Sequence, residues 1–156
     1  MPSPRDTHRM RHHHESKYWF TNGARSEEGW IECIYCGLPA DTRDHVPPLN
    51  RVEDYQHIGL AQEFYLKVPS CKQCNSLANE HLQDSIFDRI EFVKDKLARK
   101  YARLLKSAHW TEDELEELGP VLRSQVREAH VKAEIESARI DYYFGYEHLM
   151  DVLEIN

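Results

Sequence analysis

Two Cys-x-x-Cys pairs constrain this chain more than any other feature of its sequence. Cys33 and Cys36 form the first pair, and Cys71 and Cys74 form the second. Each pair can turn two thiolates toward one point, and two such pairs supply the four ligands of a closed tetrahedral zinc site. A closed site has no open position for a substrate. We therefore expect a structural zinc ion that holds the fold together, with any chemistry carried by residues beside it.

The composition is that of a globular protein with many exposed charges. Of the 156 residues, 40% are hydrophobic and 30% are charged, and the formal net charge is −7. The overall acidity argues against a protein that coats nucleic acid by bulk charge. No apolar run approaches the roughly 20 residues that span a bilayer, and the N-terminus lacks the apolar core of a signal peptide. We expect a cytoplasmic protein without a membrane partner, in which paired cysteines bind metal rather than form disulfides.

Three polar residues, Asp44, His45 and Asn75, lie between or directly after the two cysteine pairs, so a shared zinc ion would bring them close together. Asp44 and His45 are followed by Val46 and two prolines, and a proline biases the residue before it toward extended geometry. This pattern predicts a strand end that leads into a loop. Neighbours on a strand point to opposite faces, so Asp44 and His45 should not lie side by side. Asn75 directly follows the second cysteine pair, at the entry to a predicted helix.

The remainder of the chain has a helical pattern. Apolar residues recur at three- and four-residue spacing from Leu77 toward Ser107, which predicts a helix with a break. Residues 111–114 form a capping-box sequence that opens a helix. The dipeptide Gly119-Pro120 should end that helix and start the next, and Gly145 is a predicted stop.

A basic segment lies within the first predicted helical region. Between residues 89 and 106 there are seven Lys and Arg residues and only two acidic ones. Such a segment is either a solvated helix face or a surface that contacts nucleic-acid phosphates without reading sequence. Both interpretations stay open.

The ordered set Cys-x-x-Cys, Asp-His-Val-Pro-Pro and Cys-x-x-Cys-Asn resembles the His-Asn-His (HNH) nucleases, which build their site on a ββα-metal motif. The resemblance covers residues 33–81, about a third of the chain. It implies an α+β fold with a small ββα-metal zinc-knuckle core and a mostly α-helical C-terminal extension. It also implies a metal-dependent DNA endonuclease in which His45 is the general base and Asp44 and Asn75 hold a catalytic Mg²⁺ or Mn²⁺ ion.

These residue types suit phosphodiester hydrolysis. A histidine with a pKa near 6.5 can take a proton from water at neutral pH. A hard cation held by carboxylate and amide oxygens can neutralise charge on the phosphate and on the leaving oxygen.

One family feature is missing from this sequence. The middle Asn of the family usually lies shortly before the second cysteine pair, where it fastens the loop that orients the base. Here that region contains no Asn, and Asn50 lies close behind His45 instead. Gln62 or a backbone contact are the alternatives for orienting the base.

The sequence thus predicts a flexible basic arm over residues 1–25, a nuclease core over 26–85 and a helical extension over 86–156. A monomer would nick DNA and a dimer would cut both strands. RNA remains an open substrate, and the extension is the expected surface for a homodimer or a protein partner. Two alternatives compete with catalysis. One is a non-catalytic zinc-stabilised DNA-binding module, and the other is an interaction protein that docks on a larger nucleic-acid-processing assembly.

Overall fold

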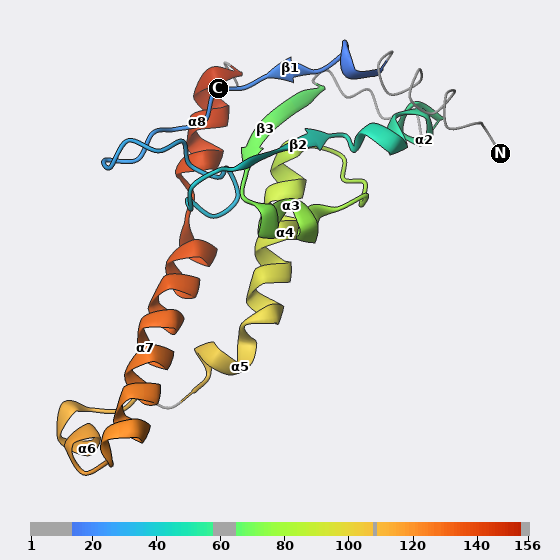
Figure 1. Cartoon of the computed structure of the whole chain (residues 1–156). Helices are drawn as coiled ribbons and strands as arrows, with labels where there is room; N and C mark the ends of the chain where they lie inside the picture. Colours follow the sequence, from blue (N-terminus) through green and yellow to red (C-terminus); the bar gives the residue numbers. More distant parts are fainter. Residues whose placement is uncertain (1–13, 58–64, 108, 154–156) are drawn as a thin grey trace.

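The structure, a computed structural model, describes residues 14–57, 65–107 and 109–153, which form a head and a helical arm (Figure 1). The head contains a small sheet, short helices and both cysteine pairs. Two long helices, α4 (Ile86–Lys100) and α7 (Pro120–Asp141), extend from the head into the arm. The fold is therefore α+β, which confirms the predicted class.

Three strands form the sheet, with β3 (Leu66–Ser70) in the middle. On one side β2 (Thr42–Val46) pairs with it in antiparallel register, and on the other side β1 (Trp19–Phe20) pairs with it in parallel. The β1 strand lies within residues 1–25, the segment predicted as a flexible basic arm. Residues 1–13 of that segment lie outside the described part of the chain.

Side chains alternate along β2 as expected for a strand that is buried on one face. Asp44 is buried, whereas its neighbours Arg43 and His45 are half-buried. Asp44 and His45 therefore point to opposite faces of the sheet, in agreement with the sequence prediction.

Beyond β2, the chain forms the short 3-10 helix η1 (Leu49–Arg51) and α2 (Val52–His57). After β3 it enters α3 (Lys72–Ala78), whose N-cap is Cys71. The predicted helical stripe is broken at Asn79, which has a positive φ of 42° and ends α3.

The break separates α3 from α4, which is the main amphipathic helix of the head. The hydroxyl of Ser85 caps α4 by accepting a hydrogen bond from the Asp88 amide. The predicted apolar stripe is confirmed on this helix, because one face is fully buried; it consists of Ile86, Ile90, Val93 and Leu97.

Three further helices complete the chain after α5 (Ala102–Leu105): α6 (Glu112–Glu116), α7 and α8 (Phe144–Val152). The predicted capping box is confirmed at Thr111, whose side chain and that of Glu114 bond each other's backbone amides. The predicted junction at Gly119-Pro120 is confirmed too, with Pro120 opening α7.

The predicted stop at Gly145 is wrong. α7 ends at Asp141, and Gly145 lies inside α8. A Cβ atom at this position would stand 2.2 Å from the backbone oxygen of Ile34. The glycine is therefore needed for close packing of α8 on the first cysteine turn, not to end a helix.

The core joins segments on both sides of the predicted boundary between residues 85 and 86. Fifteen buried residues form one cluster, which includes Ile34 and Tyr35 from the first cysteine turn, Val68 from β3 and Leu149 from α8. Within the described residues, no helix combines the length and apolar character needed to cross a bilayer.

Candidate active site and metal centre

The four cysteines converge on one point in the head. Their sulfur atoms all lie within 4.8 Å of one another, and all four residues are buried. The Sγ atoms of Cys36 and Cys71 are 3.8 Å apart. Metal–sulfur bonds of about 2.3 Å in tetrahedral geometry place the sulfurs ~3.8 Å apart, so the cluster could hold a metal ion such as zinc.

Local backbone geometry positions each pair. In the first turn, the amides of Cys36 and Gly37 both donate to the carbonyl oxygen of Cys33, and Gly37 has a φ of 76° that favours glycine. In the second, the Cys71 sulfur accepts a hydrogen bond from the Cys74 amide as α3 begins.

The arm helix α7 also reaches the cysteine cluster. Arg139 places Nη2 3.8 Å from the Cys74 sulfur and donates from Nη1 to Glu136 at 2.8 Å. Burial alone would lower the pKa of Arg139, but the neighbouring cysteines and the Glu136 carboxylate raise it above its ordinary value. Arg139 therefore supplies a permanent positive charge beside the four cysteines.

Asp44, a predicted ligand of the catalytic ion, lies in a buried ion pair. The residue is 4% exposed, and its Oδ2 accepts from Tyr35 at 2.5 Å and from Arg89 Nε at 2.7 Å. Its Oδ1 accepts from Arg89 Nη2 at 3.0 Å. A carboxylate offers about four acceptor positions, so three are in use.

Arg89 is bonded through all of its guanidinium N–H groups. Besides Asp44, it donates to the backbone oxygens of Asn79 and His81 and to the Gln83 side chain, at 2.6–2.8 Å. Burial alone would lower the pKa of Arg89, but its hydrogen bonds to Asp44 and the Asp44 charge raise that pKa. This residue ties α4 to β2 and to the loop after α3.

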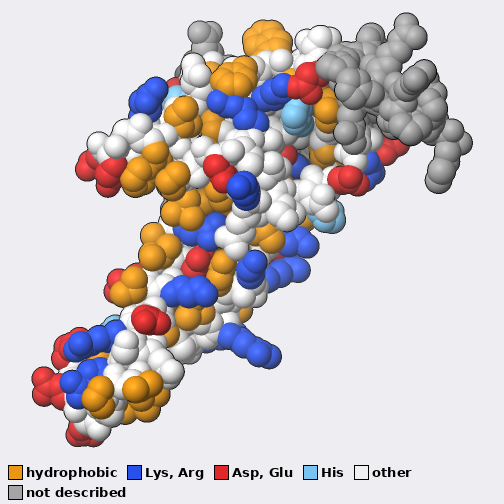
Figure 2. Space-filling model, in the orientation of Figure 1, with side chains coloured by type: hydrophobic (Ala, Val, Ile, Leu, Met, Phe, Trp, Pro, Cys, Tyr) orange, Lys and Arg blue, Asp and Glu red, His pale blue; other side chains and the backbone are white. Residues whose placement is uncertain are grey.

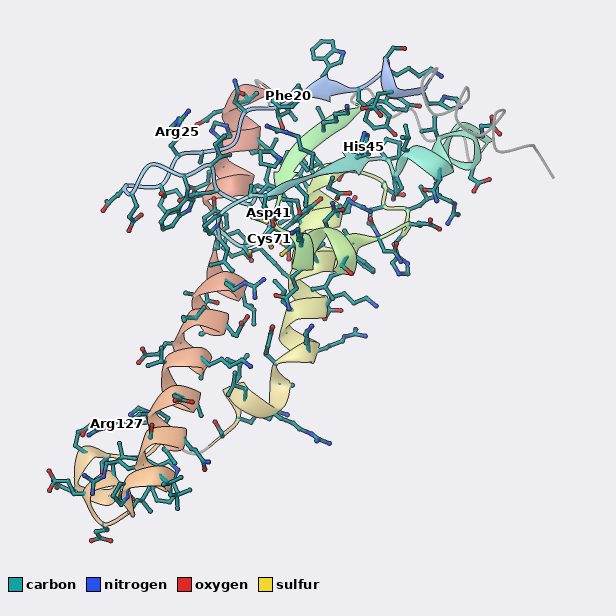
Figure 3. All side chains as sticks on the ribbon, viewed as in Figure 1. Phe20, Arg25, Asp41, His45, Cys71 and Arg127 are labelled. Atoms are coloured by element: carbon teal, nitrogen blue, oxygen red, sulfur yellow. The ribbon has the colours of Figure 1, made fainter. Side chains whose placement is uncertain are left out.

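His45, the predicted base, lies on β2 (Figure 3) and points to the opposite face of the sheet from Asp44 because the two are neighbours on the strand. Its Nε2 lies 3.0 Å from Oε2 of Glu15, and the same carboxylate forms an ion pair with Lys67. The ring of Tyr18 packs edge-on against the imidazole at 4.9 Å. Burial lowers the pKa of His45, while the charge of Asp44 opposes that shift.

Asn75 binds one side chain and one backbone carbonyl of β2 through a single end of its own side chain. Its Nδ2 donates to the Thr42 hydroxyl at 3.1 Å and to the Arg43 carbonyl at 3.2 Å. Both bonds use the amide nitrogen, and neither uses the carbonyl oxygen Oδ1. Asn75 is therefore held beside the face of β2 that carries Asp44, with His45 on the other face.

Glu15 and the pairing role of Arg89 were not predicted from the sequence. Arg89 lies three residues after Ile86 and four before Val93, on the buried stripe of α4, and an arginine in that position signals a buried partner. Nothing in the sequence around Glu15 points to His45. Of the amides considered for orienting the base, Asn50 is exposed on η1, and Gln62 lies outside the described residues.

The basic segment divides into buried and exposed members. Arg89 and Lys94 are buried, and Lys94 donates to the backbone oxygens of Ile140 and Tyr142. These two side chains therefore bind other segments of the protein and are not exposed to an external ligand.

Searches for related proteins return nothing: no protein-family model, no curated protein and no solved structure matches the chain.

Proposed function

We propose that this chain is a zinc-stabilised endonuclease of the HNH type that hydrolyses phosphodiester bonds in DNA. The observation that carries the proposal is the hydrogen bond from His45 Nε2–H to Glu15, at 3.0 Å. A proton on Nε2 leaves the lone pair on Nδ1, which is the form in which an imidazole accepts a proton. A half-buried histidine in that form supports a general base.

In the proposed reaction His45 takes a proton from the attacking water. The Glu15 carboxylate then stabilises the imidazolium and keeps the ring in place, as a buried carboxylate does for other catalytic histidines. Lys67, paired with the same carboxylate, holds Glu15 against β3.

Asp44 and Asn75 are the proposed protein ligands of a catalytic Mg²⁺ or Mn²⁺ ion. Magnesium takes few protein oxygens and fills its remaining positions with water and substrate phosphate. One acceptor position on Asp44 and Oδ1 of Asn75 fit that requirement in composition. Because Arg89 already balances the Asp44 charge, we expect weak binding. When bound, the ion would stabilise charge on the phosphate and the leaving oxygen. Because the ion and His45 lie on opposite faces of β2, this requires the phosphate to lie at the free edge of that strand, which is the outer strand of the sheet.

Plasmid relaxation by the zinc-loaded protein tests the proposal. Wild type and His45→Ala are compared with and without added Mg²⁺ or Mn²⁺, and His130→Ala on α7 serves as the matched histidine control. We expect metal-dependent nicking by wild type and the control, and its loss in His45→Ala with the zinc content unchanged. Equal nicking by His45→Ala would refute the role of His45.

The Asp44–Arg89 ion pair favours a second candidate, a non-catalytic zinc-stabilised module that binds DNA. A carboxylate held by a fully buried arginine can serve the fold alone. This candidate predicts no cleavage by wild type with any divalent ion and equal DNA affinity of wild type and His45→Ala.

A further inference from the structure

An aromatic ring and a cation lie in one row with His45 across the sheet. Phe20 on β1 pairs with Lys67 on β3, and Lys67 pairs with His45 on β2. Paired residues project to the same face of a sheet, and two strand spacings of about 5 Å separate Phe20 from His45. Figure 2 shows hydrophobic, cationic and histidine side chains together over the strands at the top of the molecule.

Arg43 completes this group, which we call the sheet strip (Phe20, Arg43, Lys67 and His45). Arg43 lies two residues before His45 and so shares its face. Its guanidinium carbon is 3.5 Å from the centroid of the Phe20 ring, and its Nη1 donates to the Thr21 carbonyl at 3.3 Å. That bond uses one of five N–H donors, so an ordered arginine retains donors for an anion.

Exposure and charge make the sheet strip accessible to an anionic ligand. Phe20 is 59% exposed although it is a large apolar residue, and the side chains of Lys67 and His45 are each 25% exposed. The strip carries two cations, and Glu15, which bonds Lys67, is the one carboxylate in contact with it among the described residues. Arg43 covers one face of the Phe20 ring, so a base would stack on the other face, with both cations close enough for phosphate contacts.

We propose that the sheet strip binds a single strand of DNA, with one base stacked on Phe20 and the neighbouring phosphates bound by Arg43 and Lys67. This inference rests on the proposed nuclease function and names the substrate class of the nuclease, because the bound strand would deliver a phosphate to His45. A stacked base must be unpaired, whereas a duplex exposes mainly phosphates along its backbone. Every base has a π face, so the strip should show little sequence preference.

Fluorescence anisotropy with labelled oligonucleotides tests the proposal. Zinc-loaded protein is titrated into single-stranded DNA, the same sequence as a duplex, and single-stranded RNA, without Mg²⁺ or Mn²⁺. Phe20→Ala should weaken single-strand binding about 5- to 100-fold, while Phe20→Trp should retain it. Phe144→Ala is the matched control, since Phe144 is 68% exposed on α8. Arg43→Ala should also reduce the salt dependence of binding by about one phosphate contact.

Each outcome is decisive because binding is measured without the activating ion. Tight single-strand binding that falls in Phe20→Ala and not in Phe144→Ala supports the strip, even if no cleavage is found and the nuclease proposal fails. Equal affinity for duplex and single strand, or no effect of Phe20→Ala, overturns the strip and leaves plasmid cleavage to be judged separately. Tighter binding of wild type to RNA than to DNA, with the same loss in Phe20→Ala, overturns DNA as the ligand of the strip.

Discussion

Two carboxylates lie near β2 and have different surroundings. Asp44 is buried, accepts three hydrogen bonds and is balanced by Arg89. Glu15 has a side chain that is 34% exposed and is shared by His45 and Lys67. A buried charge must be paired to persist, whereas a half-exposed one can exchange partners. The Asp44 carboxylate therefore stabilises the fold in this structure, and Glu15 is the one placed to act on His45.

Glu15→Ala should lower the cleavage rate roughly tenfold to a hundredfold, because the His45 ring loses the partner that orients it. Glu15→Gln should retain part of the rate, since an amide oxygen still accepts from Nε2–H. Both variants remove a negative charge that contacts the sheet strip, so both should bind single-stranded DNA more tightly. Cleavage rate and single-strand affinity are measured on the same preparations. A Glu15 variant whose cleavage rate falls together with its affinity for DNA would contradict the orienting role of Glu15.

Arg89→Leu should destabilise the protein by about 3–5 kcal/mol, because it leaves the buried Asp44 carboxylate without its cation. Urea unfolding of Arg89→Leu and Asp44→Asn measures the two losses, and the double variant measures their coupling. Arg99→Leu, which breaks an exposed pair with Asp95 on the same helix, is the matched control and should change stability by less than ~1 kcal/mol. Additive losses in the double variant would show that the pair does not act as a unit.

At the scale of elements, the first cysteine turn is the surface on which α7 and α8 meet. Tyr142 lies between the two helices, and its hydroxyl donates to Glu32 at 2.5 Å. The Tyr142 ring also covers Gly37, where an added Cβ would stand 2.6 Å from it. The two glycines at this junction, Gly37 and Gly145, allow backbone and ring to approach closely.

Gly145→Ala should destabilise the protein by about 1–3 kcal/mol, because its Cβ would clash with a backbone oxygen that cannot turn away. Helix propensity alone predicts the opposite sign, a gain of about 1 kcal/mol for alanine in α8. Gly119→Ala is the control, since a Cβ there meets nothing within 4 Å. The melting temperatures of wild type, Gly145→Ala and Gly119→Ala distinguish the two expectations. A Gly145→Ala protein more stable than wild type would show that α8 does not pack this closely on Ile34.

At the scale of the whole molecule, the cysteine cluster connects segments that are distant in sequence. The first turn and α3 supply the cysteines, and α7 brings Arg139 to the same cluster. Four thiolates around a divalent ion carry a net negative charge, which Arg139 would offset. The helical extension therefore packs directly against the cysteine cluster of the head.

Removal of the proposed zinc ion should unfold the head and release α7, because binding energy at such a site is folding energy. Circular dichroism during chelation should show loss of helix beyond the few residues of α3, with recovery on addition of zinc. Cys71→Ser should behave as the chelated protein does. An unchanged melting temperature after complete zinc removal, verified by metal analysis, would contradict this expectation.

The binding of a homodimer or protein partner by the helical extension stays a prediction. A groove of about 580 Å³ runs along α7 and includes the exposed residues Val131 and Ile135. Its lining comes from a single helix face between Pro120 and Glu136.

The sequence alone determined the features that depend on local spacing. Cys-x-x-Cys turns, the alternation around Asp44 and His45, the α4 stripe and the Thr111 capping box each follow from a few neighbouring residues. Tertiary structure decided the partners: Arg89 for Asp44, Glu15 for His45, and Ile34 for Gly145. These contacts join residues 30 or more positions apart, and no local periodicity records which distant side chain will share a buried face.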